Sequence, residues 1–314
     1  MTARPIVIGT RGSELALWQA RWVENHLREA HPSLAVRQSV IRTTGDRILD
    51  ASLSAIGDKG LFIKELENAL LAKTIDLAVH SLKDVPTRLP EGLALGAISE
   101  RDDVRDVFIA QPRSQYRRLA DVPSGATVAT GSLRRRSQLL RLMPQLRIEE
   151  IRGNLNTRFE KLNRSDWAGM LLARAGVVRL GKEHTITEVL PADVILPAVG
   201  QGALGIEIRQ DDAGLMELLQ PLNHTETMQG TLAERSLLRK LGGGCRVPIG
   251  AYGRIENGRL VLDAFVGSLD GKQSVRGTII GSPGAADELG AQLANRLLKD
   301  GAQAILAEII RSSR

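Results

Sequence analysis

In this chain of 314 residues, the first clear structural pattern is Pro5-Ile6-Val7-Ile8-Gly9-Thr10-Arg11-Gly12-Ser13. It begins with a short apolar run that is typical of a buried strand, and Arg11-Gly12-Ser13 predicts a turn. Ser13 can cap the helix expected next, and the free amides of its first turn predict an anion site beside Arg11. The helix itself is indicated by apolar residues at alternating steps of four and three, at Ala16, Ala20, Val23, Leu27 and Ala30.

The same pattern returns near the middle of the chain. Residues 126–130 predict a strand, Gly131-Ser132 a turn, and residues 133–142 a helix that carries Arg134 and Arg135. We therefore expect an α/β fold with two similar, hinged domains that face one another, like those of periplasmic binding proteins. Helix N-termini and guanidinium groups would line the cleft from both sides, and both suit carboxylates.

A further strand, predicted at residues 75–80, leads into Ser81-Leu82-Lys83-Asp84-Val85-Pro86. In open α/β sheets, ligands bind at this end of a strand, so Asp84 is better placed for chemistry than an average surface aspartate. His80 lies within the strand, and we expect a packed, hydrogen-bonded histidine there.

The polar segment 44–60 contains glycine and precedes the helix expected after Phe62. We interpret it as a mobile lid that includes Asp46 and Lys59, and a solvated loop is the alternative.

In the second half of the chain, arginines follow the ends of predicted strands and lie near turns, at Arg152, Arg158 and Arg179. Either a binding role or a solvated surface would explain them. The Gly200-Gln201-Gly202 turn and the apolar run after it predict a strand that returns to the first domain's sheet.

A small α+β domain is expected at the C-terminus. A helix is predicted from Thr231, because Thr231 and Glu234 have the spacing of a capping box. Asn257-Gly258 and Asp270-Gly271 are hairpin signals that predict a three-stranded antiparallel sheet, covered by two helices. The predicted domains are residues 1–104 with 198–222, residues 105–197, and residues 223–314.

The composition narrows the class of protein. The chain is 43% hydrophobic with one cysteine, which excludes a disulfide framework and favours a reducing compartment. No leader or membrane span is predicted, so we expect a cytoplasmic protein. A net charge of +6 suggests an anionic partner, but with only 3% aromatic residues few bases could stack. We expect a small anion with several carboxylates or phosphates, with neither nucleic acid nor a metal site.

The single cysteine, Cys245, follows Gly242-Gly243-Gly244 and precedes Arg246. Glycines allow a backbone to approach a bulky ligand, and a neighbouring arginine favours the reactive thiolate. The alternative is a cysteine that serves only as a small hydrophobic residue.

Taken together, these motifs resemble those of the hydroxymethylbilane synthase (porphobilinogen deaminase) family over nearly the whole length. The resemblance is carried by residues 9–16, 59–65, 79–86, 131–135, 152–154 and 196–202 and by the cysteine loop. Two departures are small: Leu82 stands where the family often has methionine, and Arg246 where an uncharged polar residue is common.

The resemblance implies an enzyme with a dipyrromethane cofactor, joined to Cys245 through a thioether. Four porphobilinogen molecules would be added with loss of ammonia, and hydrolysis would release the linear tetrapyrrole hydroxymethylbilane, an intermediate of haem biosynthesis. It also implies a monomer. Each pyrrole carries two carboxylates, which explains the many arginines.

The resemblance also assigns roles to single residues. It implies that Asp84 is catalytic and remains ionised, buried among arginines. The implied cofactor-binding residues are Lys83, Asp84, Thr130, Ser132, Arg134, Arg135 and Arg158, besides Cys245. The implied substrate-binding residues are Arg11, Ser13, Gln19, Arg152, Arg158 and Arg179.

The sequence is also compatible with two other functions. A hinged anion-binding protein would need the arginines but neither Asp84 nor a reactive thiol. An arginine-rich nucleic-acid binder would show steeply salt-dependent binding, but the chain lacks a basic recognition helix.

Overall fold

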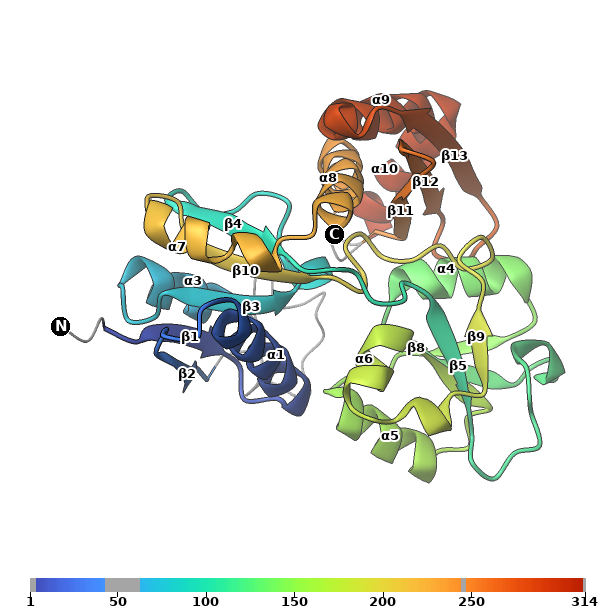
Figure 1. Ribbon diagram of the computed structural model, residues 1–314. Helices are drawn as coiled ribbons and strands as arrows, with labels where there is room; N and C mark the ends of the chain where they lie inside the picture. The colour runs from blue at the N-terminus through green and yellow to red at the C-terminus, as the bar shows by residue number, and fades with distance from the viewer. Residues whose placement is uncertain (1–3, 43–62, 244–246, 313–314) are drawn as a thin grey trace. The chain divides into compact units, whose positions relative to one another are not determined.

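The computed structural model describes residues 4–42, 63–243 and 247–312 (Figure 1). The chain forms two compact units. Unit 1 comprises Met1–Asp102 and Gly202–Met228, and unit 2 comprises Asp103–Gln201 and Gln229–Arg314. Each of the three predicted domains contains one sheet. The residues at which one domain ends and the next begins remain a prediction.

Unit 1 contains a five-stranded mixed sheet in the order β2-β1-β3-β10-β4. Its first three strands are parallel, and β10 runs antiparallel to both of its neighbours. The predicted return of the chain into this sheet after Gly202 is therefore confirmed. The strands are β1 (Ile6–Thr10), β2 (Val36–Val40), β3 (Leu77–Ser81), β4 (Leu93–Ile98) and β10 (Leu204–Arg209).

Helices cover both faces of this sheet. The apolar stripe of α1 (Glu14–Ala30) packs on one face together with α7 (Ala213–Leu218), through residues such as Val23 and Leu215. On the other face, Leu66 and Leu70 of α3 (Lys64–Leu71) pack against the sheet. Strands β3 and β4 therefore read as apolar runs rather than alternating ones, because helices cover both faces of the sheet, whereas the edge strand β2 is largely polar.

The first sheet of unit 2 repeats this design, in the order β7-β6-β8-β5-β9. Again three strands are parallel, and β5 runs antiparallel to both of its neighbours. The repeat predicted from the two Gly-Ser turns is thus confirmed. The strands are β5 (Asp106–Ala110), β6 (Thr127–Ala129), β7 (Arg147–Glu149), β8 (Gly169–Ala173) and β9 (Glu188–Leu190).

The helices of this sheet also lie on both faces. α4 (Leu133–Leu142) covers one face through Leu139, while α5 (Leu155–Arg164) and α6 (Arg174–Arg179) cover the other through Leu162 and Val177.

The C-terminal part of unit 2 is the predicted three-stranded meander, β11-β12-β13 (Figure 1). It consists of β11 (Ile249–Glu256), β12 (Arg259–Gly267) and β13 (Ser274–Gly281). One core joins it to α8 (Thr225–Lys240), α9 (Ala286–Leu297) and α10 (Gln303–Ser312). The fold class expected from the sequence is therefore confirmed.

The predicted start of α8 is wrong. Thr231 and Glu234 lie inside this helix, which begins at Thr225, and both side chains are buried. Glu234 accepts hydrogen bonds from the backbone N–H groups of Gly200 (2.6 Å) and Gly253 (2.7 Å). Its carboxylate therefore joins α8 to β11 and to the loop before β10, instead of capping the helix.

Among the described residues, no helix combines the length and the apolar character that crossing a membrane requires. His80 is packed as expected: its Nε2 lies 3.0 Å from Oε2 of Glu207, and both side chains are buried.

Candidate active site

In unit 1, the predicted site residues follow two adjacent strands. β1 and β3 are parallel neighbours, with Ile8 opposite Leu77, so their carboxyl ends lie at the same edge of the sheet. Arg11 and Ser13 follow β1, and Lys83 and Asp84 follow β3. The sheet therefore brings these four residues to one edge, as open α/β sheets do with their ligand-binding residues.

Short-range hydrogen bonds fix the turn after β1. The Ser13 hydroxyl accepts from the N–H of Ala16 (3.3 Å), so Ser13 is the predicted cap of α1. The Thr10 hydroxyl donates to the carbonyl of Ala16 (3.0 Å). Gln19, which the resemblance assigned to substrate, is buried and donates to the Ser81 hydroxyl (2.7 Å). It thereby joins α1 to the end of β3.

Lys83 and Asp84 lie on a single turn of 3-10 helix, Leu82–Asp84, directly after β3. Leu82 is buried and anchors this turn, while both charged side chains are exposed. The expectation of a buried Asp84 is thus wrong for the described chain, because the turn directs only Leu82 into the core.

In unit 2, the corresponding turn lies between β6 and α4. The Ser132 hydroxyl accepts from the N–H of Arg135 (3.5 Å) and so caps α4, and the Thr130 hydroxyl accepts from the N–H of Ser132 (3.3 Å). Arg134 and Arg135 are the second and third residues of this helix. Both are buried, at 4% and 5% exposure, which is rare for arginine unless it is paired.

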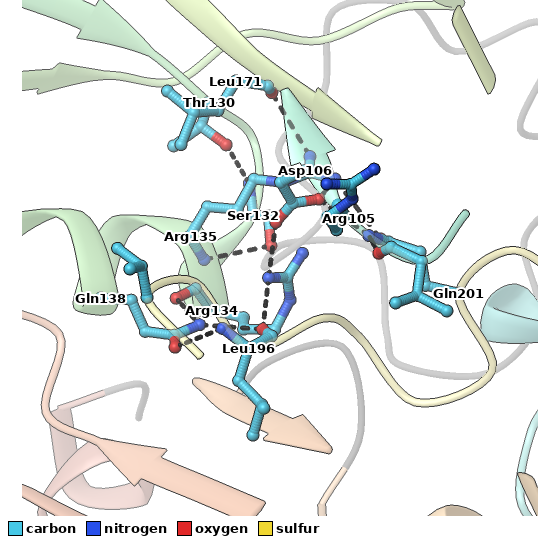
Figure 2. Close-up of polar contacts among 12 residues, drawn as sticks. Arg105, Asp106, Thr130, Ser132, Arg134, Arg135, Gln138, Leu171, Leu196 and Gln201 are labelled. Carbon is cyan, nitrogen blue, oxygen red and sulfur yellow. Dashed lines mark hydrogen bonds and ion pairs between the residues drawn. The ribbon is translucent and has the colours of Figure 1, made fainter. Parts of the chain in front are cut away.

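The partner of both arginines is Asp106, the first residue of β5 (Figure 2). Arg134 Nη1 lies 2.7 Å from Oδ2 of Asp106, and Arg135 Nη2 lies 2.8 Å from Oδ1. Gln201 Nε2 donates to the same Oδ1 (2.8 Å) and to the carbonyl of Val104 (2.7 Å). One fully buried carboxylate therefore joins two guanidinium groups and one amide.

The buried cluster of Asp106, Arg134, Arg135 and Gln201 contains more positive than negative charge. Burial by itself would raise the pKa of Asp106, but Arg134 and Arg135 outweigh it and hold this pKa well below its usual range. Burial lowers the pKa of Arg134, against the attraction of Asp106. An ionised aspartate against two guanidinium groups leaves one positive charge in excess.

Two donors of this cluster also lack acceptors. The Nε atoms of Arg134 and Arg135 are buried and have no hydrogen-bond partner in the described parts of the chain. Buried donors without partners are uncommon in native proteins. Excess positive charge and free donors together fit a ligand that bears carboxylates.

Sequence reasoning missed Asp106. It begins the apolar run Asp106-Val107-Phe108-Ile109-Ala110, where an aspartate looks like a polar residue just outside a strand. Because β5 is antiparallel to β8, with Asp106 opposite Ala173, its first residue lies at the edge where the parallel strands end. An aspartate at the start of an otherwise apolar strand could have indicated a site residue. The sequence did not show, however, in which direction this strand runs in the sheet.

The other predicted arginines of unit 2 lie after β7 and β8. Arg152 is paired with Glu150, and Arg158 Nε donates to the carbonyl of Gly153 (2.9 Å) from the first turns of α5. Arg179 ends α6 and is buried. Cys245 and the predicted lid residues Asp46 and Lys59 lie outside the described residues.

Comparison with known proteins gives the family. Residues 6–217 match the family described as "Porphobilinogen deaminase, dipyromethane cofactor binding domain". Residues 228–299 match "Porphobilinogen deaminase, C-terminal domain".

Individual relatives agree with this match. The chain is 52% identical over 310 residues to a porphobilinogen deaminase of Chlorobium chlorochromatii, covering 98% of each chain. It is also 52% identical over 306 residues to one of Desulforudis audaxviator, again covering 98% of each.

Among solved structures, the chain is similar to the probable amino-acid ABC transporter extracellular-binding protein ytmK from Bacillus subtilis. The identity is 13% and the TM-score 0.43, over 74% of this chain and 96% of that one. A likeness this distant bears on neither ligand nor activity.

Proposed function

Since the chain belongs to the porphobilinogen deaminase family, we propose that Cys245 carries its dipyrromethane cofactor and that Asp84 is its catalytic carboxylate. The enzyme is a hydroxymethylbilane synthase, a transferase of tetrapyrrole biosynthesis. Its substrate is porphobilinogen. The resemblance drawn from the motifs is thus confirmed, whereas the roles of single residues are proposals.

One observation supports the cofactor assignment most directly. The buried pair Arg134 and Arg135 has one positive charge in excess and two Nε–H donors without partners among the described residues. A carboxylate would supply both the missing charge and the missing acceptors. Dipyrromethane carries such carboxylates and, when bound, supplies the primer on which porphobilinogen units condense.

The proposed cofactor-binding residues are those that the family resemblance assigned. The carboxylates of the cofactor would be bound by Lys83, Thr130, Ser132, Arg134, Arg135 and Arg158. Arg11, Ser13, Gln19, Arg152, Arg158 and Arg179 would bind substrate carboxylates. Gln19 and Arg158 already make hydrogen bonds within the protein, so their role would include holding the end of β3 and the start of α5 in place.

Asp84 would act on the substrate through its negative charge. Loss of ammonia from porphobilinogen leaves a cation, and a fixed carboxylate stabilises such a cation and can accept a proton. Asp84 is exposed at the edge of the sheet where Arg11 also lies, so its carboxylate is accessible to a ligand.

We further propose that Asp46 and Lys59 belong to a lid, and that the enzyme acts in the cytoplasm as a monomer. The single cysteine and the absence of a disulfide framework support the reducing compartment.

Intact mass tests the anchor. After incubation with porphobilinogen, the full chain should weigh more than its polypeptide by one dipyrromethane, and it should release a linear tetrapyrrole. Cys245→Ser should show only the polypeptide mass. A wild-type chain without added mass and without tetrapyrrole product would disprove the proposed function, and an adduct on Cys245→Ser would disprove the anchor alone. An acid-aldehyde colour reaction for dipyrromethane gives an independent check.

A further inference from the structure

Arg134 and Arg135 are consecutive residues of α4, and a helix directs consecutive side chains about 100° apart. Their guanidinium groups also repel each other. Without an acceptor that both share, the two side chains would diverge.

Asp106 supplies that acceptor, with one oxygen for each arginine (Figure 2). Each guanidinium is also held by a carbonyl: Arg134 Nη1 donates to Leu196 O (2.7 Å), and Arg135 Nη1 donates to Leu171 O (3.4 Å). All these contacts use Nη atoms. The two Nε–H groups have no hydrogen-bond partner among residues 4–42, 63–243 and 247–312.

The position of Asp106 is itself fixed. The side chain is fully buried at the start of β5, and Gln201 Nε2 holds its Oδ1 at 2.8 Å while also donating to Val104 O. Asp106 therefore cannot follow the arginines if they move; the arginines must adopt the orientation that it imposes.

We propose that Asp106 is a positioning residue of the cofactor site, which holds Arg134 and Arg135 together as one paired cation for a single carboxylate of dipyrromethane. This inference rests on the proposed function. If each arginine bound its own ligand, the two guanidinium groups would bind two carboxylates of the cofactor. We expect only one, because Asp106 already neutralises one of the two positive charges.

The alternative is that Asp106 only stabilises the fold. A matched control exists in unit 1, where Asp76 is also buried and also pairs with a buried arginine, Arg209 (3.3 Å). Asp76 further accepts from the N–H of Val7 (2.9 Å). It precedes β3, at the end opposite to Lys83 and Asp84, so its loss should affect stability without affecting cofactor.

The experiment compares Asp106→Asn, Asp106→Glu and Asp76→Asn in the full chain. For each variant, thermal unfolding is recorded, and covalent dipyrromethane is followed by intact mass during incubation with porphobilinogen well below the unfolding temperature. We expect both Asp106 variants to load cofactor about tenfold or more slowly than the wild type, because one partner of a buried charge pair is lost or displaced. Asp76→Asn should unfold at a lower temperature but load like the wild type.

Folded Asp106→Asn that loads at the wild-type rate would overturn the inference, while an adduct on the wild type would leave the proposed function intact. If Asp106→Asn does not fold, Asp106→Glu provides the test, since it keeps the negative charge. Slow loading of dipyrromethane by Asp106→Glu supports a positioning role, and loading at the wild-type rate overturns it. Slow loading of Asp76→Asn would also overturn the inference, because loading would then follow stability alone. A wild-type chain that never gains mass would instead disprove the proposed function.

Discussion

Asp84 lies on an exposed turn and Asp106 at a buried strand start, and burial decides what each carboxylate can do. Both lie at the edge of a sheet where parallel strands end. Asp106 has both oxygens engaged by arginines and cannot also serve a substrate. Asp84 is exposed, so its charge remains accessible to a reacting pyrrole.

Asp84→Asn should therefore leave the fold unchanged and remove most of the activity. We expect the free energy of unfolding to change by less than about 0.5 kcal/mol, as for exposed substitutions. Turnover should fall at least about 100-fold, the range expected when a general acid or base is lost. Intact mass should still show the cofactor. The exposed Asp300→Asn is the matched control, and retained turnover in Asp84→Asn would exclude the catalytic role.

Glu67 on α3 gives a prediction that depends on pH. Partial burial raises the pKa of Glu67, and the nearby charge of Glu207 raises it further. A carboxyl group whose pKa is higher in the folded state favours folding below its unfolded pKa, and this contribution is lost as pH rises through the folded pKa. Ionised Glu67 therefore opposes folding at neutral pH.

Glu67→Gln should raise the free energy of unfolding at pH 7 to 8, by no more than about 1 kcal/mol because solvent screens this partly buried group. The gain should begin to shrink as pH falls through the raised pKa of Glu67, and it should be gone below the ordinary pKa of glutamate, about 4.3. Urea unfolding at several pH values measures it. A gain that is constant across the series would show that lost charge is not its cause.

At the scale of single elements, apolar runs and turn signals located most strands from sequence. The strands predicted at residues 75–80 and 126–130 are found as β3 (Leu77–Ser81) and β6 (Thr127–Ala129), with ends that differ by at most two residues. The start of α8 was predicted wrongly, because Thr231 and Glu234 have the sequence spacing of a capping box although they lie inside the helix. Only the fold shows that the Glu234 carboxylate is used by Gly200 and Gly253, far away in sequence.

The hairpin between β11 and β12 offers a clean test of backbone conformation. Asn257 and Gly258 both have positive φ, 50° and 73°, as a two-residue hairpin loop requires. A Cβ on Gly258 would meet no atom within 4 Å. Gly258→Ala should therefore cost only the left-handed conformation, about 1–2 kcal/mol.

Gly214 in α7 is the matched position, since its Cβ would also meet nothing within 4 Å and its φ is not positive. Gly214→Ala should stabilise the protein by up to about 1 kcal/mol, because alanine favours helix. Chemical unfolding of both variants checks the pair. Equal effects of the two substitutions would contradict the backbone explanation.

At the scale of the whole molecule, both mixed sheets place three parallel strands beside a strand that is antiparallel to its neighbours. The short Gly-Ser repeat predicted two similar domains, but it did not predict this order of strands. The pairing of Asp106 with Arg134 and Arg135 could not be predicted in the same way. Periodicity indicates which face of an element is buried, but it does not indicate which buried charges meet across 28 residues of sequence.

The discontinuous course of unit 1 leads to a last prediction. Its sheet requires β10, which lies between β3 and β4 and is the only strand that pairs with β4 in the described chain. Residues 1–102 alone lack this strand and its buried Leu204, Ile206 and Ile208. We therefore expect this fragment to show no cooperative unfolding.

The missing strand can be restored in one chain. The N–H of Asp102 donates to the carbonyl of Gly202 (3.3 Å), so the two cut ends lie close together. Residues 1–102 joined to 202–228 by a short Gly/Ser linker should fold, because loop closure over so short a distance costs little entropy. Circular dichroism during urea unfolding should show one cooperative transition for the joined chain and none for 1–102. Cooperative unfolding of residues 1–102 alone would mean that β10 is dispensable, and a joined chain that fails to fold would mean that unit 1 needs the rest of the protein.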